Sequence, residues 1–104
     1  MHDILETLER WRGEGRRVAL ATVIAIEGSA PRDPGAAMAV DERGEVAGSV
    51  SGGCVEGAVY EEARQVLAGG RARSVRYGIS DAQATEVGLT CGGAIHLFIE
   101  RLDW

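Results

Sequence analysis

The glycine-rich stretch Gly48–Cys54 carries the groups best suited to bind an anion or a metal. It leads directly into a segment with a helical pattern. Free backbone N–H groups and the helix dipole at such a position favour a negatively charged group such as phosphate. Ser49 and Ser51 add hydroxyl donors, and Gly52 and Gly53 let a ligand approach the backbone closely. The stretch therefore predicts an anion-binding loop.

Cys54 ends this stretch at the expected start of the helix. The same N-terminal position favours the thiolate, which is the nucleophilic form of cysteine and the form that binds soft metals. The local pattern leaves a second interpretation open. In that interpretation the stretch is a glycine turn, Ser51 is the N-cap and Cys54 is a small buried thiol.

Cys91 is followed by Gly92 and Gly93, almost a mirror image of the glycine pair that precedes Cys54. If the fold brings the two segments together, two thiols face one cleft and can hold a metal. The alternative is two unrelated turns in which each cysteine is a small core residue. The chain has only two cysteines and two histidines, so we do not expect a four-ligand structural zinc site.

Arg32 lies in the segment Gly28–Gly35, between Pro31 and Pro34. The prolines disfavour helix and predict a stiff, extended loop that holds the arginine away from the preceding strand. A guanidinium held in this way suits a phosphate or a partner's carboxylate. A solvated surface arginine is the alternative.

The elements that must position these groups follow from hydrophobic periodicity and glycine stops. A first helix is predicted to present Ile4, Leu5, Leu8 and Trp11 on one face. A second helix is predicted to begin directly after Cys54 and to end at Gly69–Gly70. The expected strands are 18–27 (interior, since both its faces are apolar), 37–40, 45–50, 73–77 and 94–101. Residues 80–87 fit a short helix or a loop. The prediction is one domain, residues 1–104, with an α+β fold: a two-layer sandwich of a mixed sheet of about five strands and two main helices.

The composition excludes several classes of protein. The 104 residues are 45% hydrophobic and 26% charged, typical of a globular domain, and the net charge of −5 disfavours binding to nucleic acid or an anionic membrane. The longest uncharged apolar stretch, residues 18–26, is too short to cross a bilayer. The N-terminus has no signal-peptide pattern, so we expect a cytoplasmic protein.

Taken together, the segments 28–35, 48–56 and 88–93 resemble the XdhC/CoxI family, and the resemblance covers nearly the whole chain. Members of this family are accessory proteins for molybdenum hydroxylases of the xanthine dehydrogenase and carbon monoxide dehydrogenase type. The resemblance implies that they bind molybdenum cofactor transiently, protect it, assist its sulfuration and deliver it to the apoenzyme. Longer members continue into a second, Rossmann-like domain, which we expect this chain to lack.

The resemblance also implies a set of site residues. The expected cofactor-binding residues are Arg32, Ser49, Ser51, Gly52, Gly53, Cys54, Cys91 and Gly92. Backbone amides after Ser51 would hold the phosphate or the pterin, Arg32 would contact the anion, and Cys54 or Cys91 would shield or ligate the metal.

We therefore expect a cofactor chaperone rather than an enzyme. Its expected partners are a xanthine dehydrogenase-type molybdoenzyme and, as further candidates, a separate Rossmann-domain chain of the same family or a sulfurtransferase. A homo-oligomer is also expected, because a chain of this size buries only about two-thirds of the surface that its unfolded form exposes, and an exposed cofactor would need to be covered by another chain. Two alternatives stay open: a thiol-based sulfur carrier or redox protein that uses Cys54 and Cys91, and a structural domain that pairs with a Rossmann-domain chain.

Overall fold

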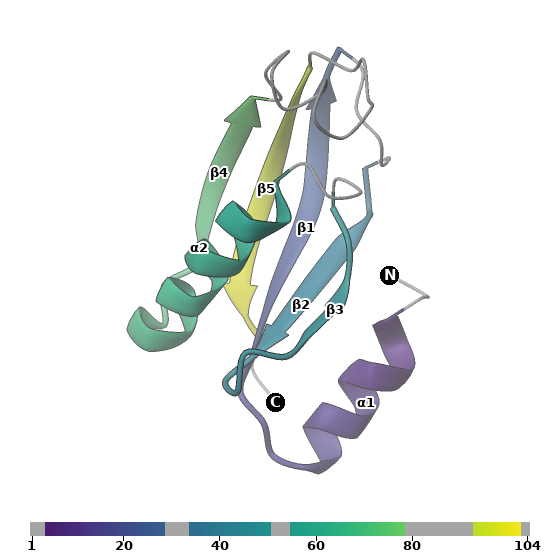
Figure 1. Cartoon of the computed structure of the whole chain (residues 1–104), viewed down its shortest axis with the longest axis vertical. Helices are drawn as coiled ribbons and strands as arrows, with labels where there is room; N and C mark the ends of the chain where they lie inside the picture. The colour runs from purple at the N-terminus through teal and green to yellow at the C-terminus, as the bar shows by residue number, and fades with distance from the viewer. Residues whose placement is uncertain (1–3, 29–33, 51–54, 79–92, 103–104) are drawn as a thin grey trace.

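A computed structural model describes residues 4–28, 34–50, 55–78 and 93–102. Two helices and five strands follow one another along the chain (Figure 1). They are α1 (Leu5–Gly13), β1 (Val18–Glu27), β2 (Ala37–Asp41), β3 (Val46–Gly48), α2 (Glu56–Gly69), β4 (Arg73–Gly78) and β5 (Ala94–Arg101). Every element predicted from periodicity is present, with bounds shifted by a few residues. The segment 80–87, for which the pattern was undecided, lies outside the described residues.

The strands form one sheet in the order β3-β2-β1-β5-β4. β1 is the central strand, which confirms the prediction made from its two apolar faces. All four pairings are antiparallel, so the prediction of a mixed sheet was wrong. The reason is topological: β3 and β4, joined through α2, run in the same direction but lie at opposite edges of the sheet and never pair.

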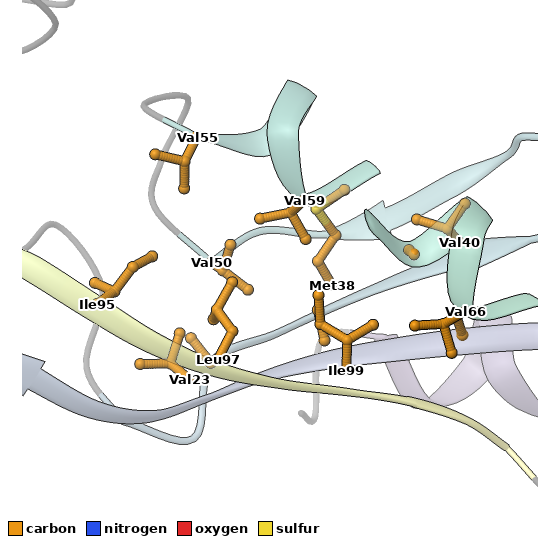
Figure 2. Close-up of a cluster of buried hydrophobic side chains, with 14 of the residues drawn as sticks. Val23, Met38, Val40, Val50, Val55, Val59, Val66, Ile95, Leu97 and Ile99 are labelled. Atoms are coloured by element: carbon orange, nitrogen blue, oxygen red, sulfur yellow. The ribbon is translucent and has the colours of Figure 1, made fainter. Parts of the chain in front are cut away.

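One face of the sheet is covered by α2, which confirms the α+β sandwich. Successive residues of a strand point to opposite faces, and the residues on this face pack against one side of α2 (Figure 2). The helix contributes Val59, Ala63, Val66 and Leu67, and the strands contribute Ala19, Ala21, Val23, Met38, Val40, Ile95, Leu97 and Ile99. Ile95, Leu97 and Ile99 point inward from β5, as predicted.

The opposite face carries α1, which adds a partial third layer to the predicted two. Ile4, Leu8 and Trp11 pack against alternate residues of β1 and β2, and Ile4 and Trp11 are each only 1% exposed. This cluster covers β1 and β2 and leaves β5 and β4 without a helix on that face.

α2 ends at the glycine pair predicted from the sequence. Gly70 adopts the left-handed conformation with φ of 73°, and its N–H donates to the Val66 carbonyl at 2.6 Å. Neither α1 nor α2 has the length and apolar character needed to cross a bilayer.

Candidate functional site

Of the predicted site residues, Ser49 lies in the described part of the chain. The others lie outside it: Arg32, Ser51, Gly52, Gly53, Cys54, Cys91 and Gly92. Their roles stay predictions, but the described residues on either side of them define where each segment is attached.

The three motif-bearing segments are attached at the same end of the sheet. Glu27, the last residue of β1, pairs with Ala94, the first of β5, and Gly78, the last of β4, pairs with Ala94 from the other side. At the other edge, Gly48 ends β3 beside Met38, next to the first residue of β2. Figure 1 shows the arrowheads of β1 and β4 at this end, beside the start of β5. The segments 29–33, 51–54 and 79–92 therefore all connect to this end.

The start of α2 lies over the same end. Val50 and Val55, which flank the segment 51–54, are 0% and 5% exposed. Both belong to the buried cluster that contains Val23 and Ile95 (Figure 2). Ile95 lies two residues after Gly93, so the chain flanking Cys54 and the chain flanking Cys91 enter one cluster. The convergence of the two thiols themselves stays a prediction.

Ser49 is engaged with Glu56, the first residue of α2. Its hydroxyl donates to Glu56 Oε2 at 2.7 Å, and the Val50 backbone N–H donates to the same oxygen at 3.1 Å. These bonds tie the end of β3 to the first turn of α2 across the segment 51–54. An anionic carboxylate at this point is also favoured by the helix dipole. Glu56 belongs to the predicted motif 48–56, but no role was predicted for it, although an acidic residue in the first helical turn is a recognisable signal.

A second group of polar side chains lies at this end, on the face away from α2. Glu27 Oε2 accepts a hydrogen bond from Arg76 Nε at 2.7 Å and lies 2.5 Å from His96 Nε2. The hydrogen bonds from Arg76 and His96 lower the pKa of Glu27 to about 2, and the partnership raises the pKa of Arg76. Glu27 is therefore an anion across the physiological range and holds two cationic or donor groups together.

A small open hollow adjoins this group. It has a volume of about 220 Å³ and is lined by Glu27, Gly28, Arg76, Gly93 and Ala94. A Cβ atom placed on Gly28 would lie 3.4 Å from the Cα of Gly93, and Gly28 has a φ of +69°. The two glycines therefore leave backbone, rather than side chains, at this wall of the hollow.

The described part of the chain contains no cluster of metal-ligating side chains. No group of three or more His, Cys, Asp and Glu side chains with the spacing of a metal site occurs among these residues. Cys54 and Cys91, the predicted ligands of a soft metal, lie outside the described residues, so their role as ligands stays a prediction.

The model of the XdhC and CoxI family matches residues 11–78, about two thirds of the chain. The chain belongs to the XdhC and CoxI family. This confirms the resemblance inferred from the three motifs, two of which lie wholly inside the matched region.

Relatives of this XdhC and CoxI domain carry it as part of longer chains. It is 42% identical over 88 residues to the molybdenum cofactor insertion chaperone PaoD of Escherichia coli K12, covering 85% of this chain and 27% of PaoD. It is 32% identical over 103 residues to a probable xanthine dehydrogenase subunit from Bacillus subtilis 168, covering 97% of this chain and 30% of that protein.

A crystal structure of a protein named a xanthine dehydrogenase from Bacillus halodurans has the same fold. The TM-score is 0.78 at 35% identity, covering 99% of this chain and 31% of that chain. The domain thus spans less than a third of the length of each of these relatives.

Proposed function

We propose that this domain binds molybdenum cofactor as cargo and delivers it to a molybdoenzyme of the xanthine dehydrogenase type. Family membership and the name of PaoD support this function. The structural observation that carries it is the attachment of all three motif-bearing segments at one end of the sheet. Molybdenum cofactor is a pterin with a dithiolene-bound metal and a terminal phosphate, so its binding needs an anion site and soft ligands close together.

The proposal assigns separate roles to the predicted residues. Backbone amides of Ser51, Gly52 and Gly53, in the segment between β3 and α2, bind the phosphate. The thiolates of Cys54 and Cys91 shield or ligate the metal.

Two further segments complete the assignment. Arg32 is the second anion contact, and Gly92 lets the cofactor approach the backbone beside Cys91. Ser49 contributes chiefly by closing the loop through its hydrogen bond to Glu56, since that bond uses its one hydroxyl hydrogen. The domain carries the cofactor as cargo and delivers it to its partner, so it acts as a chaperone rather than as an enzyme.

The direct test is retention of the cofactor. The purified chain is incubated with molybdenum cofactor released from a donor molybdoenzyme, re-isolated by gel filtration, and assayed for molybdenum and for the fluorescence of the oxidised pterin. We expect stoichiometric retention by the unaltered chain and loss of most of it in Cys54→Ser and Cys91→Ser. Ser74→Ala, at an exposed position of β4, is the control variant and should retain the cofactor fully.

The outcomes separate this function from its rivals. Equal retention by Cys54→Ser would remove that thiol from the mechanism, and absence of retention by the folded chain would contradict a self-sufficient carrier. In the latter case the assay is repeated with a Rossmann-domain chain of the same family added. A persulfide or a Cys54–Cys91 disulfide, detected by intact mass after mild oxidation, would instead favour a sulfur carrier or redox protein.

The proposed partners have their own readout. Activation of a cofactor-free xanthine dehydrogenase-type enzyme by the loaded domain tests delivery. Sedimentation of the domain with and without cofactor tests the proposed homo-oligomer. We expect self-association to be stronger when cofactor is bound, because a second copy would shield the cofactor from solvent.

A further inference from the structure

The group Glu27, Arg76 and His96 lies on the face of the sheet away from α2, beyond the residues of β1 that pack against α1. Ile95 and Leu97 point toward α2, so His96 between them points to the opposite face. Val75 and Tyr77 pack against the α2 core, so Arg76 also faces away. α1 lies over β1 and β2 instead.

This network is not explained by stability. Glu27 and Arg76 are 52% and 56% exposed, and exposed ion pairs contribute little to folding because both charges remain hydrated. The bonds from Arg76 and His96 to Glu27 both fall on Oε2, and Arg76 donates to it through Nε. These two bonds do not use Oε1 of Glu27 or the terminal nitrogens of Arg76, so each side chain has further hydrogen-bonding capacity.

The adjoining hollow limits what can bind. Its volume of about 220 Å³ lies below the range of about 300–1,000 Å³ typical of pockets that enclose a whole small molecule, so it suits one ring system of a larger ligand. Glu27 is acceptor-only and Arg76 is donor-only. The complementary ring edge presents adjacent N–H donors to the carboxylate and an oxygen acceptor to the guanidinium.

We propose that Glu27 and Arg76 bind the 2-amino-4-oxopyrimidine edge of a pterin, with Gly28 and Gly93 forming the wall beside the ring. This rests on the proposed function, because that edge belongs to the cargo: its amino group and ring N–H face Glu27, and its oxygen faces Arg76. Gly28 opens the motif that contains Arg32, and Gly93 closes the motif that contains Cys91. A ring in the hollow is thus next to both motifs along the chain.

The hollow and the residues that lead into α2 lie on opposite faces of the same end of the sheet. The hollow is lined from the face away from α2, whereas Val50 and Val55 are buried on the α2 face. A cofactor bound to both must lie across the end of the sheet, with its pterin ring on one side and its phosphate on the other.

The experiment uses the metal-free, phosphate-free probes pterin and lumazine, whose fluorescence is titrated with the full chain. Lumazine has an oxygen in place of the 2-amino group and so lacks one of the donors for Glu27. We expect the unaltered chain to bind pterin about 10-fold or more tightly than lumazine. We expect Glu27→Gln to weaken pterin binding by about 10- to 100-fold and to abolish the preference. Arg76→Gln should weaken both probes by similar factors, since both present the 4-oxygen.

Glu62→Gln and Arg73→Gln are the matched controls, because these residues form a comparable surface pair at 2.9 Å between α2 and β4. They should leave both affinities unchanged, with circular dichroism confirming the fold of every variant. No pterin binding by the unaltered chain, equal affinity for the two probes, or equal effects of Glu27→Gln and Glu62→Gln would each overturn the proposal. If Glu27→Gln does not fold, the proposal is still tested by the preference of the unaltered chain for pterin over lumazine and by the affinities of Arg76→Gln for the two probes.

The cofactor-retention assay separates the two proposals. Retention of molybdenum cofactor with no effect of Glu27→Gln on either assay would leave the chaperone function intact and refute the pterin site. Pterin binding that depends on Glu27, without retention of the complete cofactor by the folded chain, would support the site and refute the self-sufficient carrier.

Discussion

The hydroxyl of Ser49 donates a 2.7 Å hydrogen bond to the carboxylate of Glu56, and this bond connects the two sides of the segment that contains Cys54. The Val50 N–H donates to the same carboxylate oxygen, while Val50 and Val55 are buried in the core. Both ends of the segment 51–54 are therefore fixed by packing and by a polar clamp. A loop whose ends are fixed loses less conformational entropy when it binds a ligand.

Removing this clamp should cost stability as well as cargo affinity. We expect Glu56→Ala to lower the free energy of unfolding by about 1–3 kcal/mol, because it leaves the Val50 N–H and the Ser49 hydroxyl without this acceptor. Urea denaturation followed by circular dichroism measures the change. Glu61→Ala, at an exposed position of the same helix, should change the free energy by less than about 0.5 kcal/mol. Equal effects of the two substitutions would contradict the clamp.

Gly48 is required where β3 ends, immediately before Ser49. Its φ is +80°, and an added Cβ would lie 2.3 Å from the Ala37 carbonyl oxygen and 2.7 Å from Ile4 Cγ2. We expect Gly48→Ala to lower the unfolding free energy by about 2–5 kcal/mol through backbone strain and overpacking. The matched substitution is Gly57→Ala in α2, where the new Cβ meets no atom within 4 Å apart from the neighbouring backbone of its own helix. We expect it to stabilise the fold by up to about 1 kcal/mol. Thermal denaturation should show a lower melting temperature for Gly48→Ala and an unchanged or higher one for Gly57→Ala than for the unaltered protein.

Asp41 makes the stability depend on pH. Burial raises its pKa, but hydrogen bonds from the Glu45 N–H, the Arg16 guanidinium and the Arg43 N–H outweigh burial and lower the pKa below its ordinary value of 3.8. A carboxyl group whose pKa is lowered by folding stabilises the protein above its unfolded pKa. This contribution is lost as the pH falls below 3.8 toward the folded value.

The variant Asp41→Asn isolates this contribution. We expect it to lower the unfolding free energy at pH 7 by about 1–3 kcal/mol, because the side chain is fully buried and accepts several hydrogen bonds. The difference from the unaltered protein should narrow as the pH is lowered through 3.8 in urea titrations. A difference that stays constant down to about pH 2.5 would show that the charge of Asp41 does not stabilise the fold.

The local sequence pattern was sufficient to predict the helices and strands, but not to predict which strands pair in the sheet. The double-sided apolar run of β1 placed it in the sheet interior, and the pair Gly69–Gly70 predicted the end of α2. A mixed sheet was a natural expectation from a strand–helix–strand connection, but the connection from β3 to β4 crosses three intervening strands. The separation of β3 from β4 in the sheet depends on pairing between strands far apart in the sequence, which hydrophobic periodicity does not reveal.

The same limit explains what was missed at the site. Glycine-rich motifs are visible in the sequence, and the attachment of all three at one end of the sheet agrees with their predicted joint role. Glu27 is separated from Arg76 by 49 residues and from His96 by 69. The register shift between Val23 and Ala25 further changes which residues of β1 lie beside β5. His96 alone reads as an ordinary outward residue, because only the sheet order places it beside a carboxylate.

Ile4, the N-cap residue of α1, supports the end of the sheet at which β3 ends. Ile4 is 1% exposed and approaches Gly48, whereas its neighbour Leu5 is 42% exposed. We expect Ile4→Ala to lower the free energy of unfolding by about 2–5 kcal/mol, as a buried large-to-small substitution does. Leu5→Ala should change it by less than about 1 kcal/mol, because little buried surface is lost and alanine favours the helix. Since Gly48 leads into the Ser49 clamp, Ile4→Ala should also speed proteolysis within residues 49–55, measured by mass spectrometry of the fragments, while Leu5→Ala should not. Equal cleavage of the two variants would mean that Ile4 does not stabilise this end of the sheet.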